Sequence, residues 1–260
     1  SHLLCSFQVQ MAGKSEEPGE KAETITSRVV VPLTVTQRPP IRIASPLSGD
    51  SWCAMGFGPD SYHRTTVMPL NGEYYAAQRY AIDWIQFVPD ESDDNHNAAA
   101  GSTVRLNSGD PKKNESYPQY GKPVFAVADG EVVGVIDRLP DNTPGAFPDD
   151  ITLEEATGNS VVIRIADGTY AFYGHMKPGS IRVKEGDVVQ QGQMIGQLGN
   201  SGNSDLPHLH FHVSDTPSPL AGSSVPYVFD SFTVTGRGPS DDDLQNAIDE
   251  PGTVLTIQEY

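Results

Sequence analysis

The sequence predicts an all-β protein with few short helices. Its apolar residues occur in short, β-branched runs, and its 25 glycines and 21 prolines follow no fixed period. Such runs, separated by turn-forming residues, are typical of strands joined by hairpins. Ala-Asp-Gly stands between two of these runs at 128–130 and again at 166–168. With 260 residues, the chain is long enough for one large all-β domain or two small ones.

The elements are expected in the following order. Residues 12–27 are polar and charged, so the segment 1–27 is expected to be a disordered leader. Strands are expected over 28–37 and 41–46, and the segment 28–50 is expected to pack on the core. Pro32 places the first of these strands at a sheet edge, because proline cannot donate a ladder hydrogen bond.

The rest of the chain alternates strands with polar connections. A strand is expected over 79–87, and the polar composition of 89–116 predicts a long loop. Further strands are expected within 123–137, 159–165, 166–176, 191–199, 208–213 and 227–236. The segment 236–260 is predicted to be an acidic tail with one helical turn over 243–250.

The composition excludes several classes of protein. A net charge of −17 repels the phosphates of a nucleic acid and the surface of an anionic membrane. No stretch approaches the ~18 to 20 apolar residues of a membrane-spanning helix. The two cysteines, Cys5 and Cys53, are too few for a zinc ribbon or a disulfide-rich scaffold. The sequence leaves open whether Cys5 is lipid-modified, paired with Cys53 or free.

Three of the seven histidines lie in one strand-like run, HLHFH. Strand alternation places His208, His210 and His212 on one face, and Leu209 and Phe211 on the other. Imidazoles on that face recur about every 7 Å, twice the rise of ~3.3 Å per residue. Two of them can therefore share one site, one as a metal ligand and its neighbour as a catalyst. The alternative is a set of ordinary polar residues on a solvated strand.

Asp83 lies in the middle of an apolar strand, between Ile82 and Trp84. A carboxylate there is costly unless it is paired or bound to a metal. Taken alone, Asp83 is slightly better explained as an exposed carboxylate, or as one paired with Arg79, than as a metal ligand. Together with the histidine run, it is expected to be a metal ligand, because zinc accepts both nitrogen and oxygen ligands.

Three motifs resemble one family. GNSGNSDLPHLHFHV at 199–213 resembles the signature of the lysostaphin-type (LytM-like) zinc metallopeptidases, which cut peptide bonds in bacterial peptidoglycan. GKPVFAVADGEVVGV at 121–135 resembles that family's first hairpin, and 173–199 resembles the stretch between its catalytic His and its HxH strand. The resemblance covers about residues 51–235. It implies a metallopeptidase domain there, with an antiparallel β-sandwich-like core of the duplicated, barrel-sandwich hybrid type.

The resemblance also implies the site residues. His63, Asp83 and His210 are implied as zinc ligands, and His175 and His208 as the catalytic pair. Zinc then activates a water, one neutral histidine takes its proton, and the other histidine stabilises the oxyanion or protonates the leaving amine. The sequence does not assign these two roles. No further cofactor is expected.

His63 departs from the family pattern, since it precedes Asp83 by twenty residues instead of a few. We expect a hairpin, with a strand over 64–69 and a turn at Asn71-Gly72, to bring the two residues together. The alternatives are that His63 is a surface residue, or that His96 takes its place from within the polar loop.

Two further residues, His212 and Tyr173, are close in sequence to the expected site residues. His212 stands where many family members have Glu, and it is assigned no metal role. Tyr173 lies two residues before His175 and either donates a hydrogen bond to the site or packs in the core.

The expected function is therefore a secreted or periplasmic zinc metalloendopeptidase acting on peptidoglycan peptides, with no nucleic-acid partner and no membrane span. The first alternative is a non-catalytic, cell-wall-binding or regulatory member of the same fold. The second is a sugar-uptake phosphocarrier that uses paired histidines, although that function has no use for His63 and Asp83.

Overall fold

The computed structural model of the chain describes residues 2–12, 24–34, 39–91 and 100–259. It divides into two compact units, Ser1–Pro39 and Pro40–Tyr260. In the first unit, β1 (His2–Ala12) and β2 (Thr24–Thr34) pair as an antiparallel hairpin, where the sequence predicted a leader. The boundary predicted at residue 27 thus falls inside a strand. The other predicted domain boundaries stay predictions.

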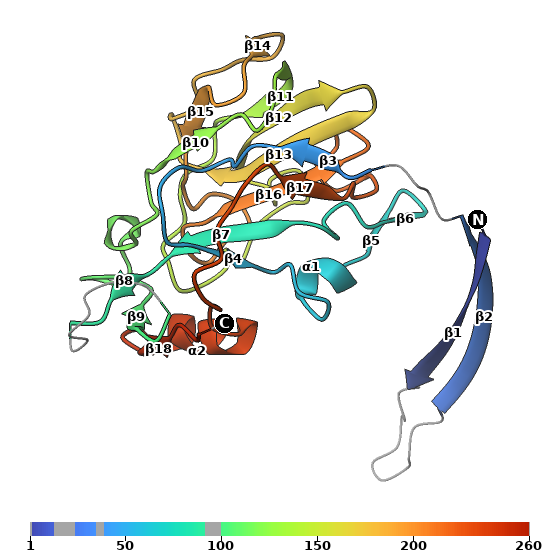
Figure 1. Cartoon of the computed structure of the whole chain (residues 1–260), viewed down its shortest axis with the longest axis horizontal. Coiled ribbons are helices and arrows are strands. Elements are labelled where there is room, and N and C mark those ends of the chain that lie inside the picture. The colour runs from blue at the N-terminus through green and yellow to red at the C-terminus, as the bar shows by residue number, and fades with distance from the viewer. Residues whose placement is uncertain (1, 13–23, 35–38, 92–99, 260) are drawn as a thin grey trace. The chain divides into compact units, whose positions relative to one another are not determined.

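The second unit is built on one seven-stranded antiparallel sheet (Figure 1). Its order is β14 (Val188–Val189), β11 (Gly130–Ile136), β12 (Asn159–Ala166), β13 (Thr169–Met176), β16 (Leu209–Ser214), β7 (Ile82–Gln86) and β4 (Trp52–Met55). β16 comes late in the chain yet lies between β13 and β7. It therefore joins the early strands of the sheet to the later ones.

Smaller sheets and short helices complete this unit. The paired strands are β10 (Pro123–Phe125) with β15 (Met194–Gln197), β3 (Ile41–Ile43) with β17 (Tyr227–Phe229), β5 (Met68–Leu70) with β6 (Glu73–Tyr75), and β8 (Val88–Pro89) with β9 (Thr103–Arg105) and β18 (Leu255–Thr256). The described helices are α1 (Tyr62–Thr65), the 3-10 turn η1 (Asn114–Ser116) and α2 (Asp241–Asp249). The prediction of an all-β fold with few short helices is confirmed.

The main core lies against one face of the large sheet. Leu209, Phe211 and Val213 are fully buried in it, as the alternation of β16 predicted. Val124 of β10 and Ile195 of β15 belong to the same cluster, so the small β10–β15 sheet covers this face as a second layer. The histidines of β16 consequently point to the opposite face, where the site lies.

A second apolar cluster covers part of that opposite face. It includes Ile85 of β7 and, from α2, Leu244 and Ala247. A capping box between Ser240 and Asp243 begins this helix by satisfying its first free N–H groups. The predicted single helical turn is therefore wrong: α2 has nine residues, and its apolar side packs into the core.

The predicted loop over 89–116 is also more ordered than expected. β9 and η1 lie within it, and Val104 of β9 is completely buried in the second cluster. Residues 92–99 lie outside the described part of the chain. Neither α1 nor α2 is long and apolar enough to cross a membrane.

Candidate metal centre and catalytic histidines

Asp83 and His210 meet because β7 and β16 are neighbours in the sheet. The two residues are direct partners in the antiparallel register. His210 Nδ1 lies 2.9 Å from Asp83 Oδ1. Both side chains are largely buried, and the little surface that they keep lines a cavity. The carboxylate of Asp83 thus has a polar partner in His210, as its place in an apolar strand led us to expect.

His63 reaches the same carboxylate from α1. Its Nε2 lies 3.4 Å from Asp83 Oδ2, and its Nδ1 lies 3.0 Å from the carbonyl oxygen of Gly56. The carbonyl can only accept, so Nδ1 carries the hydrogen and Nε2 keeps its lone pair. His63 is buried, which excludes the alternative of a surface histidine. His96 falls outside the described residues.

The hairpin expected between His63 and Asp83 is present but shorter than predicted. Asn71 and Gly72 both have positive φ, 53° and 83°, as a two-residue hairpin turn of the I′ type requires. The flanking strands are only β5 and β6. Residues 64 and 65 belong to α1, so the strand expected to begin there is wrong. The helix, and not a strand end, carries His63 to the site.

These three side chains form a set that fits a zinc ion. One ligand atom from each of His63, Asp83 and His210 lies within 4.8 Å of the other two. Zinc binds nitrogen and oxygen ligands at about 2.0 to 2.2 Å, which separates neighbouring ligand atoms in a tetrahedron by about 3.4 Å. Two nitrogens, one carboxylate and an enclosed position are therefore what a catalytic zinc site uses, with one place left for water or substrate.

The protonation of the set suits metal binding. Burial lowers the pKa of His63 to about 4, against the opposing effect of Asp83. Burial alone raises the pKa of Asp83, but His63, His208 and His210 outweigh it and hold that pKa well below its usual value. At neutral pH, His63 is thus neutral and Asp83 is ionised. Both are already in the form that a metal binds.

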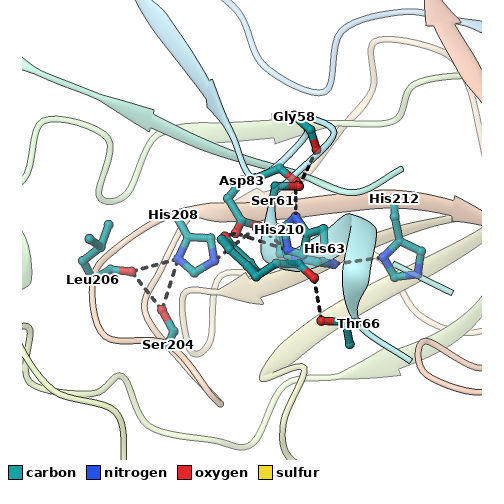
Figure 2. Close-up of polar contacts among 12 residues, drawn as sticks. Gly58, Ser61, His63, Thr66, Asp83, Ser204, Leu206, His208, His210 and His212 are labelled. Carbon is teal, nitrogen blue, oxygen red and sulfur yellow. Dashed lines mark hydrogen bonds and ion pairs between the residues drawn. The ribbon is translucent and has the colours of Figure 1, made fainter. Parts of the chain in front are cut away.

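His175 and His208 lie side by side next to this set, with ring centroids 4.6 Å apart. His175 Nδ1 lies 2.7 Å from the carbonyl oxygen of Ser201. His208 Nδ1 lies 3.0 Å from the carbonyl oxygen of Leu206, a contact drawn as a dashed line in Figure 2. Each ring therefore donates from Nδ1 and keeps Nε2 free. His208 Nε2 lies 3.6 Å from Asp83 Oδ1, so this free nitrogen faces the metal-binding set.

His175 has a left-handed backbone, with φ 57°. Non-glycine residues rarely adopt this conformation, and they keep it only where the surroundings enforce it. Here the N–H of His175 donates to the Thr157 carbonyl, and the His175 carbonyl accepts from the N–H of Gly199. Burial, assisted by His208, also holds the pKa of His175 well below its usual value, so the ring is neutral.

Of two tyrosines that lie close to the histidines in the sequence, only one reaches the site. Tyr173 is buried in the main core, where its hydroxyl accepts a hydrogen bond from Val127 N at 2.9 Å. It packs away from the site, which is the core alternative. Tyr62, which the sequence analysis missed, donates its hydroxyl hydrogen bond to Asp83 Oδ2. The only sequence signal for a role of Tyr62 in the site was its position next to His63.

The five predicted residues line one cavity of about 460 Å³. Its other wall is the exposed side of α2, where Asp241, Gln245 and Ile248 recur at the spacing of one helical face. Apolar residues such as Met55 and Leu206 line the remainder. A cavity of this size, lined by apolar side chains and a few convergent polar groups, suits a segment of substrate.

Gly56→Ala is expected to weaken the metal site. Gly56 has φ +70°, and an added Cβ would lie 2.5 Å from His63 Nδ1. The left-handed backbone costs alanine about 1 to 2 kcal/mol, and the clash displaces the imidazole. Gly58→Ala is the matched control, because its Cβ would meet no atom within 4 Å. Thermal unfolding and zinc titration should show a loss in Gly56→Ala alone; equal behaviour of the two variants contradicts the expectation.

The comparison with known families matches residues 116–221 to the model of Peptidase family M23. This stretch contains His175, His208 and His210, whereas His63 and Asp83 precede it. The chain is 26% identical over 154 residues to the cell division protein DipM of Caulobacter vibrioides, covering 59% of this chain and 21% of that protein. It is 28% identical over 158 residues to the peptidoglycan DD-endopeptidase ShyA of Vibrio cholerae, covering 57% and 32%.

Among solved structures, the catalytic domain of the prophage-encoded M23 protein EnpA from Enterococcus faecalis, in a mutant form, is 26% identical. The match covers 54% of this chain and 88% of that domain, with a TM-score of 0.32. The chain spans about a fifth to a third of the two curated relatives, 21% and 32% of their lengths. The family match falls on the motifs that the sequence analysis singled out, so residues 116–221 of the chain are similar to Peptidase family M23, as the resemblance to the LytM-like family predicted.

Proposed function

We propose that this chain is a zinc-dependent endopeptidase that hydrolyses the peptide cross-links of bacterial peptidoglycan, in the periplasm or outside the cell. One observation carries the proposal. Three buried side chains that suit zinc and two histidines with free Nε2 atoms line the same cavity of about 460 Å³. Relatives that include a peptidoglycan DD-endopeptidase support the choice of substrate.

Each ligand has a defined atom for the metal. His63 would supply Nε2, His210 would supply Nδ1, and Asp83 would supply a carboxylate oxygen. When bound, zinc lowers the pKa of a water toward ~7 and polarises a carbonyl group. Tyr62 keeps the carboxylate in place by donating to Asp83 Oδ2, which leaves Oδ1 toward His208 and His210.

His175 and His208 move the protons. Each ring is fixed by an Nδ1–H bond to a backbone carbonyl, so each acts through Nε2. One histidine takes the proton of the attacking water, and the other, once protonated, stabilises the oxyanion or protonates the departing amine. Their rings are close enough to serve a single peptide bond. The low pKa of His175 favours its neutral, basic form at the start of the reaction.

The alternative is a non-catalytic module that binds the cell wall. The test is to incubate the zinc-loaded protein with purified peptidoglycan, and to measure new amino groups and released peptides by mass spectrometry. We expect about one zinc per chain, the content of a single site. We also expect release of peptides that stops with a chelator and resumes with added zinc.

His210→Ala is the matched control for this assay, because it removes a ligand from a strand that stays in the sheet. It should bind little zinc and release no peptides. A wild-type protein that sediments with peptidoglycan but produces no new amino groups would favour the non-catalytic module. Peptide release that is equal with and without chelator would exclude the proposed zinc chemistry.

A further inference from the structure

His212 lies directly behind the metal-binding face of His210. It is two residues further along β16 and completely buried. Its Nδ1 lies 3.0 Å from His210 Nε2, so the two imidazoles are joined by a hydrogen bond, which is drawn as a dashed line in Figure 2. The ring of Phe172, its register partner on β13, lies 4.8 Å away and limits its rotation.

The direction of this hydrogen bond follows from the metal site. His210 turns Nδ1 toward Asp83, and a nitrogen that binds a metal carries no hydrogen. The ring hydrogen of His210 must then be on Nε2, from which it donates to His212 Nδ1. His212 in turn carries its own hydrogen on Nε2. This is the nitrogen that has no hydrogen-bond partner among the described residues.

In the metal-bound state, this buried N–H thus has no acceptor in the described part of the chain, which is unfavourable. A leucine at position 212 would avoid this cost in a site that is already apolar on one side. The advantage of a histidine over a leucine at this position must therefore come from Nδ1, the nitrogen that contacts His210. We propose that His212 is a positioning residue for the metal ligand His210, holding its ring at the angle at which Nδ1 meets Asp83 and the metal. This inference rests on the proposed metal site.

The chemistry of imidazole suits this role in both states of the protein. Without metal, His210 Nδ1–H donates to Asp83 Oδ1, and its Nε2 then accepts from His212 Nδ1–H. With metal, the direction reverses, and His212 Nδ1 accepts. Imidazole can do both, because either ring nitrogen can carry the hydrogen, whereas a carboxylate can only accept. The bond between the two rings can therefore persist when metal enters or leaves.

The test compares two substitutions that differ in whether they keep a hydrogen-bond acceptor next to His210. His212→Asn keeps an oxygen near the place of Nδ1, whereas His212→Leu has no acceptor. Loss of an outer hydrogen-bond partner of a metal ligand typically costs about 10- to 100-fold in metal affinity. We expect that loss in His212→Leu and little loss in His212→Asn, measured by competition with a zinc chelator. Cobalt substitution should also give a changed visible spectrum in His212→Leu.

The metal-free proteins provide a second readout that a packing role would not reproduce. In the metal-free form, His212 Nε2 is a buried nitrogen without a hydrogen-bond partner among the described residues, and His212→Leu removes it, so this form should unfold at a temperature no lower than that of the wild type. Ser214→Ala, one position further on the same face of β16, is the control and should bind zinc normally. Equal zinc affinity in wild type and His212→Leu, or equal loss in both His212 variants, would overturn the inference.

Nitrogen NMR of the zinc-loaded wild type tests the proposal without any variant. His212 should carry its hydrogen on Nε2 and accept at Nδ1. A hydrogen on His212 Nδ1 in that state would overturn the positioning role even if His212→Leu fails to fold. A wild-type protein that binds no zinc would instead overturn the proposed function, so the two failures are distinguishable.

Discussion

Asp83→Asn is expected to abolish tight zinc binding while the protein remains folded. Asparagine has the shape of aspartate, but it lacks the charge that balances the metal and the surrounding histidines. Asp83 is the only one of the three proposed ligands with a negative charge. Its loss should therefore cost more than the about 10- to 100-fold that follows from losing an outer hydrogen-bond partner. Dialysis followed by metal analysis measures this directly.

Asp205→Asn is the matched control for that experiment. Asp205 is as buried as Asp83, at 8% exposure each, and it lines the same cavity. It is not among the three residues whose ligand atoms converge. We expect it to retain zinc with a stoichiometry near that of the wild type. Wild-type zinc content in Asp83→Asn, or equal loss in both variants, would contradict the ligand assignment.

His175→Asn and His208→Asn are expected to retain zinc and to lose about 10²- to 10⁴-fold in the rate of peptide hydrolysis, the usual contribution of a proton-transfer group. Asparagine is chosen because it tolerates the left-handed backbone of His175, whereas alanine would add strain. Zinc content and initial rates should be measured on the same samples. A variant that loses zinc as completely as Asp83→Asn would show that its histidine is a ligand.

A variant that carries both His175→Asn and His208→Asn tests whether the two histidines act in the same step. If the two histidines act in one step, losing both should cost little more than losing the first, as residues that act as a unit are not additive. Fully additive losses would instead indicate separate steps. Either result keeps both histidines in the reaction, whereas a single variant with the wild-type rate removes that residue from it.

Structural features that depend on the local sequence pattern could be predicted from the sequence. Strand alternation separated His210 from Leu209 and Phe211, and the Asn71-Gly72 pair indicated the turn between His63 and Asp83. The isolated charge of Asp83 indicated a partner. The family resemblance then supplied the catalytic roles, which, like export and most domain boundaries, stay predictions.

Contacts between distant segments could not be predicted in this way. Nothing in the sequence near residue 241 indicates that α2 walls the cavity, since its acidic composition equally suits an exposed tail. The left-handed backbone of His175 is imposed by Thr157 and Gly199 and not by its own sequence. The contact between His210 and His212 depends on the orientation of two rings, which alternation alone does not determine.

The late position of β16 in the chain has a consequence for biosynthesis. Asp83 and His210 are 127 residues apart, and β16 must insert between β13 and β7 before they can meet. At roughly 5 to 20 residues per second, a ribosome needs about 6 to 25 seconds to cover that distance. During this interval Asp83 lacks its partner His210 on β16, although Met55 of β4, its other register partner, has already been synthesised. A nascent chain that has not yet reached β16 therefore cannot bring Asp83 and His210 together, so the proposed ligand set assembles only late in synthesis.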